Sequence, residues 1–270
     1  MNKLKRTDRV SLIVKSLVEN PNKLITYSEF SRLFAAAKSS ISEDLSIIKR
    51  VFKCAEVGDI VTVAGAAGGV KYVPQESVAD KKALLEALCQ ALSEGDRAIV
   101  GGYFYIADIL YNPKYIKGVA KMIAERFYKE NVNCVMTIET KGIPLAFMTA
   151  TILAVPLVIV RKQNKITDGA TVSINYMSGS TNKLGQMFVH KGALNKGDNV
   201  LIVDDVMRGG GTIKGLMRLA NEFSANVVGS AVLLELNAPN NKVIEDVFAL
   251  LRLKTDQNKL FSVDIGQNVL

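Results

Sequence analysis

The sequence is poor in the residues from which metal centres and disulfide frameworks are built. It has one histidine and three cysteines in 270 residues. With His190 alone, a histidine-based metal cluster is excluded and a Ser–His–Asp triad is disfavoured. The three cysteines are widely spaced and odd in number, without a Cys-x-x-Cys pair, which argues for a reducing cytoplasm and against disulfides or zinc. The start, MNKLKRTDRVSL, lacks the apolar region of a signal peptide, so we expect a cytoplasmic protein without a metal site.

Long hydrophobic runs are also scarce, with one exception. Residues 142–160 carry no charge over a length close to that of a membrane span. Pro156 interrupts the run, and the β-branched residues after it are typical of a strand. The run therefore predicts a buried helix followed by a buried parallel strand, and no membrane partner; a membrane helix is the alternative.

Positive charge gathers near the N-terminus. The net charge is +8, and residues 1–74 hold twelve Lys or Arg against seven Asp or Glu, whereas the rest of the chain holds 22 against 19. A basic N-terminal quarter is expected of a part that approaches nucleic acid. A solvated basic face without a partner is the alternative.

The N-terminal quarter predicts three helices and a hairpin. Apolar residues recur at helical spacing over 10–18, a short helix is expected over 28–35, and Ser40 and Glu43 predict a capping box at the start of the third helix. The third helix carries an apolar stripe of Ile41, Leu45, Ile48 and Phe52, and a polar and basic stripe of Ser42, Ser46, Lys49 and Lys53. Strands over 60–63 and 70–73 flank a glycine-rich tip at 65–69, as in a β-hairpin wing.

After a polar linker at 74–80, helices and strands alternate, which predicts a mostly parallel sheet covered by helices. The expected helices are 81–92, 116–129, 143–154 and 212–223, and the expected strands are 134–138, 155–160, 200–203 and 227–234. Residues 161–199 are rich in Gly, Ser, Thr and Asn and predict a long, weakly structured loop with a functional or mobile role.

The strongest motif is VLIVDDVMRGGGT at 200–212. We expect the strand to end in the adjacent carboxylates Asp204 and Asp205, which suit the hydroxyls of a ribose. The glycines that follow let backbone amides close around a phosphate, and the next helix adds favourable partial charge at its N-terminus. The run is neither a Walker loop nor Gly-x-Gly-x-x-Gly.

This run resembles the phosphoribosyl pyrophosphate (PRPP) motif of type I phosphoribosyltransferases. The pyrophosphate loop of that family resembles Glu139-Thr140-Lys141-Gly142. Adenine phosphoribosyltransferases have segments that are similar to Arg161-Lys162 and to His190-Lys191-Gly192. Part of the base pocket of these enzymes resembles residues 101–105. A solvated Lys141 and core aromatics at 103–105 are the alternatives. The resemblance implies a PRPP site made of Asp204, Asp205, Arg208, Gly209, Gly210, Gly211, Thr212, Thr140, Lys141, Gly142, Arg161, Lys162 and Tyr103.

Two departures from the enzymes argue against catalysis. Arg208 and Gly209 stand where the family's phosphate loop has small residues, and Ser173-Ile174-Asn175-Tyr176 lacks the glutamate that adenine phosphoribosyltransferases carry beside the tyrosine of their mobile loop. Loss of an acidic group weakens stabilisation of a cationic transition state without preventing PRPP binding. We therefore assign no catalytic residue.

The N-terminal segment resembles a winged helix whose third helix enters the major groove. The resemblance implies DNA contacts from Lys38, Ser39, Ser40, Ser42, Ser46, Lys49, Arg50, Lys53 and the wing residue Lys71. We expect a winged-helix DNA-binding domain at 1–74 and a phosphoribosyltransferase-like α/β domain at 75–270.

Across its length the chain resembles the purine operon regulators of Gram-positive bacteria, through ISEDLSIIK, AGAAGGVKY, TKGIPLA and TVSINYMSGS. The resemblance implies a homodimer that binds double-stranded promoter DNA under the control of PRPP. An adenine or xanthine phosphoribosyltransferase with an accessory domain and an RNA-binding attenuation protein are the alternatives. The sequence leaves open repression or activation, a need for Mg²⁺, and competition by guanosine alarmones.

Overall fold

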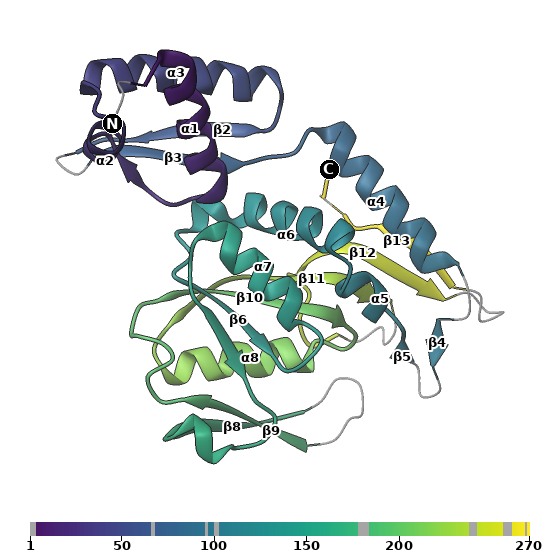
Figure 1. Cartoon of the computed structure of the whole chain (residues 1–270). Coiled ribbons are helices and arrows are strands. Elements are labelled where there is room, and N and C mark those ends of the chain that lie inside the picture. The colour runs from purple at the N-terminus through teal and green to yellow at the C-terminus, as the bar shows by residue number, and fades with distance from the viewer. Residues whose placement is uncertain are drawn as a thin grey trace. The chain divides into compact units, whose positions relative to one another are not determined.

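The computed structural model describes residues 4–65, 68–94, 97–99, 103–177, 184–237, 242–255, 261–267 and 269–270. The chain forms two compact units (Figure 1). The first comprises Met1–Ser77 with Thr151–Ala154, and the second comprises Val78–Ala150 with Val155–Leu270.

The first unit packs three helices against a small antiparallel sheet. Its elements in chain order are α1 (Arg6–Glu19), β1 (Ile25–Thr26), α2 (Tyr27–Phe34), α3 (Lys38–Cys54), β2 (Gly58–Val63) and β3 (Gly69–Pro74). The strand order is β1-β3-β2, so the predicted helices and hairpin are confirmed, and β1 is an addition too short to leave a pattern. The apolar stripe of α3 is buried against residues of α1 and α2, including Ile13, Leu17, Phe30 and Phe34.

The predicted capping box at Ser40 and Glu43 is wrong. α3 begins at Lys38 with Ala37 as its N-cap, and no side chain caps it. α2 ends at Phe34, and its C-cap Ala35 is in the left-handed region. The next helix starts three residues after this cap, which places Ser40 inside its first turn. The reciprocal hydrogen bonds of a capping box occur at α2 instead, between Thr26 and Glu29.

The second unit is an α/β fold around a six-stranded sheet of order β13-β12-β11-β10-β6-β7. All neighbouring pairs are parallel except β12 with β13. Its elements are α4 (Val78–Ser93), β4 (Ala98–Ile99), β5 (Tyr103–Phe104), α5 (Ala107–Leu110), α6 (Pro113–Phe127), a 3₁₀ turn (Tyr128–Glu130), β6 (Cys134–Ile138), α7 (Ile143–Leu153), β7 (Leu157–Val160), a second 3₁₀ turn (Ile166–Asp168), β8 (Thr171–Met177), β9 (Leu184–His190), β10 (Asn199–Met207), α8 (Gly211–Glu222), β11 (Asn226–Leu236), β12 (Phe248–Thr255) and β13 (Phe261–Ile265).

The uncharged run at 142–160 forms α7 and then β7, as predicted. β7 pairs in parallel with β6, and both strands contribute to the main hydrophobic core. Within the described residues, no helix is both long and apolar enough to cross a membrane.

The expectation of a weakly structured loop over 161–199 is wrong. Much of this segment is an antiparallel pair, β8 with β9, which contacts α8 and buries Tyr176, Met187 and Val189. The polar residues that suggested a loop alternate with apolar ones along β8, so the strand buries one face and exposes the other.

The strand before the glycine loop also differs from the prediction. β10 does not end before the carboxylates but continues to Met207, pairing with β11 along that length. With β6 it pairs only over Val200–Ile202. Asp204 and Asp205 therefore lie inside the strand, on the part that extends past its pairing with β6.

Candidate functional site

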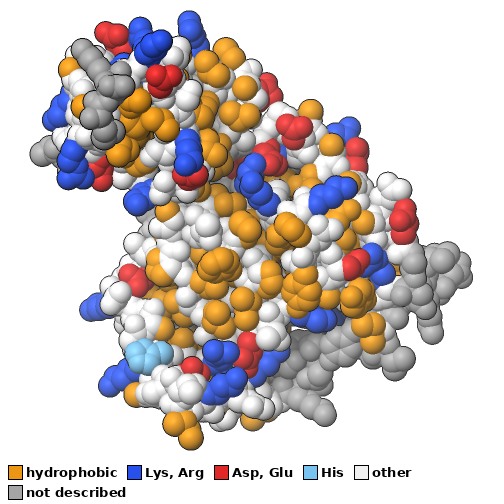
Figure 2. All heavy atoms as spheres, viewed as in Figure 1, with side chains coloured by type: hydrophobic (Ala, Val, Ile, Leu, Met, Phe, Trp, Pro, Cys, Tyr) orange, Lys and Arg blue, Asp and Glu red, His pale blue; other side chains and the backbone are white. Residues whose placement is uncertain are grey.

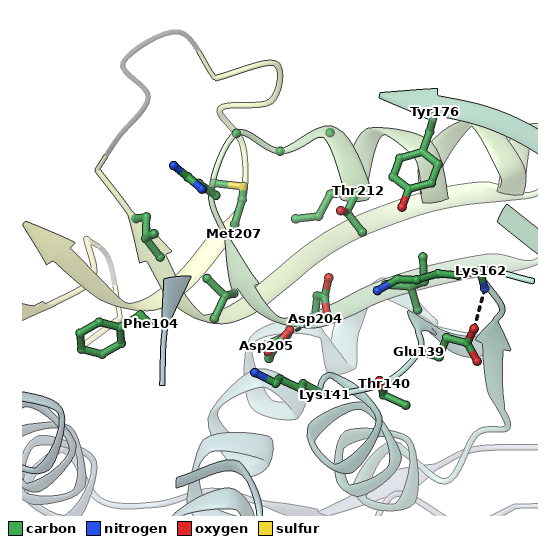
Figure 3. Close-up of a pocket in the computed structure, with 18 residues that line it drawn as sticks. Phe104, Glu139, Thr140, Lys141, Lys162, Tyr176, Asp204, Asp205, Met207 and Thr212 are labelled. Carbon is green, nitrogen blue, oxygen red and sulfur yellow. Dashed lines mark hydrogen bonds between the residues drawn. The ribbon is translucent and has the colours of Figure 1, made fainter. Parts of the chain in front are cut away.

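A cavity of about 320 Å³ lies at the carboxyl edge of the parallel sheet. Ligands of open α/β sheets bind at this edge. Figure 3 shows the loop after β6 on one side, the start of α8 and Tyr176 on the other, and Asp204 and Asp205 between them. The lining residues are Phe104, Ile138, Glu139, Thr140, Lys141, Lys162, Tyr176, Asp204, Asp205, Val206, Met207, Arg208, Gly209, Gly210, Gly211, Thr212, Ile213 and Leu236.

The two adjacent carboxylates differ in environment. Asp204 is only 6% exposed, and its Oδ1 accepts a hydrogen bond of 2.9 Å from the backbone N–H of Asp205. Burial raises the pKa of Asp204 well above its ordinary value, and the neighbouring Asp205 carboxylate raises it further. Asp205 is half-buried. The two carboxyl groups thus present oxygen acceptors to the cavity. Because Asp204 is buried, its ionised form is unfavourable unless a hydrogen-bond donor or a cation lies beside it.

The glycine loop joins β10 to α8 as predicted. Gly210 is the N-cap of α8 and has a φ of 80°, a left-handed conformation that favours glycine. The first amides of a helix have no partner within it, so the start of α8 presents N–H donors and positive partial charge. With Thr212 beside them, these groups suit a phosphate.

The loop between β6 and α7 lies across the cavity from the glycine loop (Figure 3). Lys141 and Thr140 are exposed and line the cavity. The peptide bond between Glu139 and Thr140 is cis. Gly142 does not line the cavity, but a Cβ atom there would lie 2.5 Å from Oδ1 of Asp204 and 2.8 Å from Oγ1 of Thr137, so only glycine fits.

Arg161 and Lys162 take different positions. Lys162 lines the cavity, and its backbone N–H donates to Oε1 of Glu139 at 2.7 Å. Arg161 is not among the lining residues; its guanidinium pairs with Glu139 at 3.3 Å and Asp168 at 3.6 Å. Burial raises the pKa of Glu139, but the hydrogen bonds from Lys162 and Arg161 outweigh burial and leave it below the ordinary value. Glu139 thus connects Arg161 to the cavity wall.

Part of the cavity lining is apolar, and apart from Phe104 its residues were not singled out from the sequence. These apolar residues include Phe104, Ile138, Val206, Met207 and Leu236. The segment 101–105 was singled out for a base pocket, yet of its described side chains Phe104 is the one that lines the cavity. Gly101, Gly102 and the side chain of Tyr103 lie outside the described residues.

Tyr176 is a further lining residue absent from the predicted set. A Cβ atom on Gly185, its partner across β8 and β9, would lie 2.8 Å from the Tyr176 ring, and one on Gly215 would lie 3.0 Å from its Cβ. The absence of a side chain at Gly185 and at Gly215 therefore leaves room for the Tyr176 side chain. Burial raises the pKa of the Tyr176 phenol, and the nearby Asp204 adds to the effect. In Figure 3 its hydroxyl points toward the cavity.

In the first unit, the start of α3 borders a groove of about 560 Å³. Lys38, Ser39 and Ser42 line it together with residues of α2 and of the wing. Among the residues predicted to contact DNA, Ser40 and Lys71 are half-buried, and the others are exposed: Lys38, Ser39, Ser42, Ser46, Lys49, Arg50 and Lys53. Lys49 pairs with Asp59 of β2 at 3.8 Å, and the tip residues Ala66 and Ala67 lie outside the described part.

A buried carboxylate in α3 was also missed. Asp44 has no exposure and accepts hydrogen bonds from Arg6 at 3.0 Å and from Arg9 at 2.6 Å. An aspartate within an apolar helix face is the signal that could have found it, because a buried charge needs a partner. These bonds attach α1 to the helix that carries the candidate DNA contacts.

Two segments of the chain match different protein families. Residues 5–74 match the family described as "Bacterial purine repressor, N-terminal", and residues 106–268 match the phosphoribosyl transferase domain. The purine biosynthesis transcriptional repressor PurR of Bacillus subtilis (strain 168) is 44% identical over 97% of this chain and 92% of its own length. The chain belongs to the bacterial purine repressor family.

Proteins similar to this chain include both a transcriptional repressor and a transcriptional activator. The purine biosynthesis transcriptional activator PurR of Lactococcus lactis subsp. lactis (strain IL1403) is 40% identical over 97% of either chain. The adenine phosphoribosyltransferase structure from Rhodothermus marinus DSM 4252 shares 28% identity with a TM-score of 0.55, covering 64% of this chain and 99% of its own. The Bacillus and Lactococcus relatives are transcriptional regulators and match nearly the whole chain, so this purine repressor family member is a transcriptional regulator of purine biosynthesis.

Proposed function

We propose that PRPP binds in the cavity of the second unit and modulates the affinity of the first unit for promoter DNA. The observation that supports the proposal is that one cavity is lined by a helix start, by adjacent carboxylates and by lysines, which match the three kinds of polar group in this ligand. The helix start with Gly209–Thr212 suits the 5-phosphate, and Asp204 and Asp205 suit the ribose hydroxyls. Lys141 and Lys162 suit the diphosphate.

A magnesium ion fits the same arrangement. Among the described residues no group of three or more His, Cys, Asp or Glu side chains could hold a metal alone. Mg²⁺ commonly takes one or two carboxylates and completes its shell with ligand phosphates and water. Asp204 and Asp205 would supply the protein oxygens, and the ion would neutralise charge on the diphosphate.

We assign DNA binding to residues 1–74 and effector binding to residues 75–270. The exposed residues at the start of α3 would read base edges, and Lys49, Arg50 and Lys53 would contact phosphates. A small basic domain binds weakly alone, so we propose a homodimer that engages two half-sites of double-stranded DNA together. PRPP rises when purines are scarce, and the protein would act in the cytoplasm as its sensor.

The alternative is a working adenine or xanthine phosphoribosyltransferase. In the described parts of β8 and β9, which correspond to the enzymes' mobile loop, no Asp or Glu accompanies Tyr176. The assay that separates the two functions follows PRPP consumption with adenine and with xanthine. We expect binding without turnover, and sustained turnover with either base would favour the enzyme.

Titration calorimetry with PRPP and Mg²⁺ tests the effector site. Replacing Asp204 and Asp205 by Ala should weaken binding by about 1–3 kcal/mol for each charged hydrogen bond lost. Asp198→Ala is the control, since Asp198 caps a turn at the opposite end of β10. Unchanged PRPP affinity in the double variant would remove this cavity as the site.

A further inference from the structure

A cluster of charged side chains next to the cavity takes no part in lining it. Glu235, near the end of β11, is only 7% exposed. Its Oε1 accepts a hydrogen bond of 2.6 Å from Nζ of Lys242, and its Oε2 accepts one of 2.8 Å from Nε of Arg252. Arg252 is the neighbour of Glu235 in the parallel register of β11 and β12. A carboxylate this buried needs its partners, so Glu235 fixes where Lys242 lies.

The residues that follow Lys242 contact the glycine loop. The backbone N–H of Val243 donates to the carbonyl of Gly209 at 3.0 Å. A Cβ atom on Gly210 would lie 3.4 Å from Ile244, which is van der Waals distance, so Ile244 lies directly beside this glycine. Ile244 also packs against the main core. We call Lys242–Val247 the backing segment.

The far end of the backing segment is held as well. The hydroxyl of Ser230 on β11 donates to the carbonyl of Asp246 at 3.3 Å, and Val247 packs on the core. The segment is therefore anchored by the Glu235–Lys242 pair at its start and by β11 at its end. Between these anchors it meets Gly209 and Gly210.

Three successive glycines lose much conformational freedom when they are ordered around a ligand. A contact that orders them beforehand lowers that cost and so raises affinity. The hydrogen bond from Val243 to Gly209 is such a contact. It acts on the backbone of the loop itself.

We propose that Glu235 is a positioning residue for the phosphate loop: through Lys242 it holds the backing segment against Gly209 and Gly210, and this preorganises the loop for a phosphate group. The proposal rests on the proposed function for the identity of the ligand. The contacts argued to order the loop join protein groups only, so they can be tested in the ligand-free protein.

The test compares E235Q, K242M and K242R with a matched control, K254M. Lys254 pairs with Asp264 at 2.7 Å on the same sheet, but both side chains are more than half exposed. Hydrogen exchange of the peptide covering 206–214 is measured without ligand, and PRPP affinity is measured by calorimetry. E235Q and K242M should exchange this peptide faster and bind PRPP about tenfold more weakly. K242R should restore both values, and K254M should leave both unchanged.

Each outcome decides the matter. Exchange of the loop peptide at the wild-type rate in K242M overturns the proposal, and so does a rise of the same size over the whole second unit, because that reports general destabilisation. If the wild-type protein fails to bind PRPP while K242M still loosens the loop selectively, the effector assignment fails and the positioning role of Glu235 stands.

Discussion

Gly142 lies directly against Asp204, since a Cβ atom on the glycine would be 2.5 Å from the carboxylate Oδ1. Gly142 lies in the loop that follows β6, and Asp204 belongs to the neighbouring strand β10. The loop that carries Lys141 therefore sets the position of the buried carboxylate.

Replacing Gly142 by Ala should weaken PRPP binding. The added methyl group must displace Asp204 or Thr137, and overpacking of this kind costs about 1–3 kcal/mol of folding stability. Calorimetry on G142A should show weaker PRPP binding, because the displaced Asp204 no longer holds its place in the cavity. G192A is the matched control, because its Cβ would meet only the exposed His190 ring at 3.2 Å. Wild-type affinity in G142A would show that Asp204 can shift freely.

Replacing Asp204 by Asn should stabilise the ligand-free protein at neutral pH while it weakens PRPP binding. Burial and Asp205 raise the folded-state pKa of Asp204 above its unfolded value of 3.8, and Lys162 opposes the shift. As pH rises above 3.8, the unfolded state ionises while the folded state keeps the proton, so this carboxyl lowers stability with pH until its folded pKa is passed. Asparagine does not ionise and lacks this loss.

Thermal unfolding of D204N and the wild type at pH 4, 6 and 8 measures the effect. The melting temperature of D204N should exceed that of the wild type by a margin that grows with pH, at about 1.4 kcal/mol of stability for each unit of pKa difference. A margin independent of pH would show that the pKa of Asp204 is the same in the folded and unfolded states.

The sequence pattern predicted those features of the fold and the site that depend on local periodicity and on general rules of sheet topology. Continuous apolar strands separated by amphipathic helices gave the parallel sheet, and the carboxyl-edge rule brought Lys141 together with Asp204. The features that the sequence pattern did not predict depend on contacts between segments that are distant in the chain. Glu139 pairs with Arg161, which diverts that arginine from the cavity while Lys162 enters it. β8 and β9 look polar because each buries one face only.

Replacing Asp59 by Asn should strengthen DNA binding at low salt. The Asp59 carboxylate lies 3.8 Å from Nζ of Lys49, and 48% of the lysine side chain is exposed. The carboxylate therefore competes with DNA phosphate for the lysine ammonium group. Such surface pairs are worth at most about 1 kcal/mol, and the gain should be of that size. E19Q, which breaks the exposed pair with Lys15 on α1, is the control. Fluorescence anisotropy at several salt concentrations measures both variants.

Replacing Lys49 or Arg50 by Ala should weaken binding to all DNA sequences alike and flatten the salt dependence by about one unit each. Replacing Ser39 or Ser42 should change the ranking of operator sequences instead, since residues at the start of α3 reach base edges. Competition binding with operator variants distinguishes the two effects. Equal loss of affinity with no change in ranking for the serine variants would exclude them from base reading.

The central claim is that the cavity in the second unit controls DNA binding by the first. Its most direct test is the affinity of the full chain for purine-promoter DNA, measured at fixed salt with and without saturating PRPP and Mg²⁺. We predict a saturable change of about 5–150-fold, the range of ordinary allosteric coupling, that is absent when Asp204 and Asp205 are both Ala. Identical DNA affinities with the cavity empty and saturated would contradict the account.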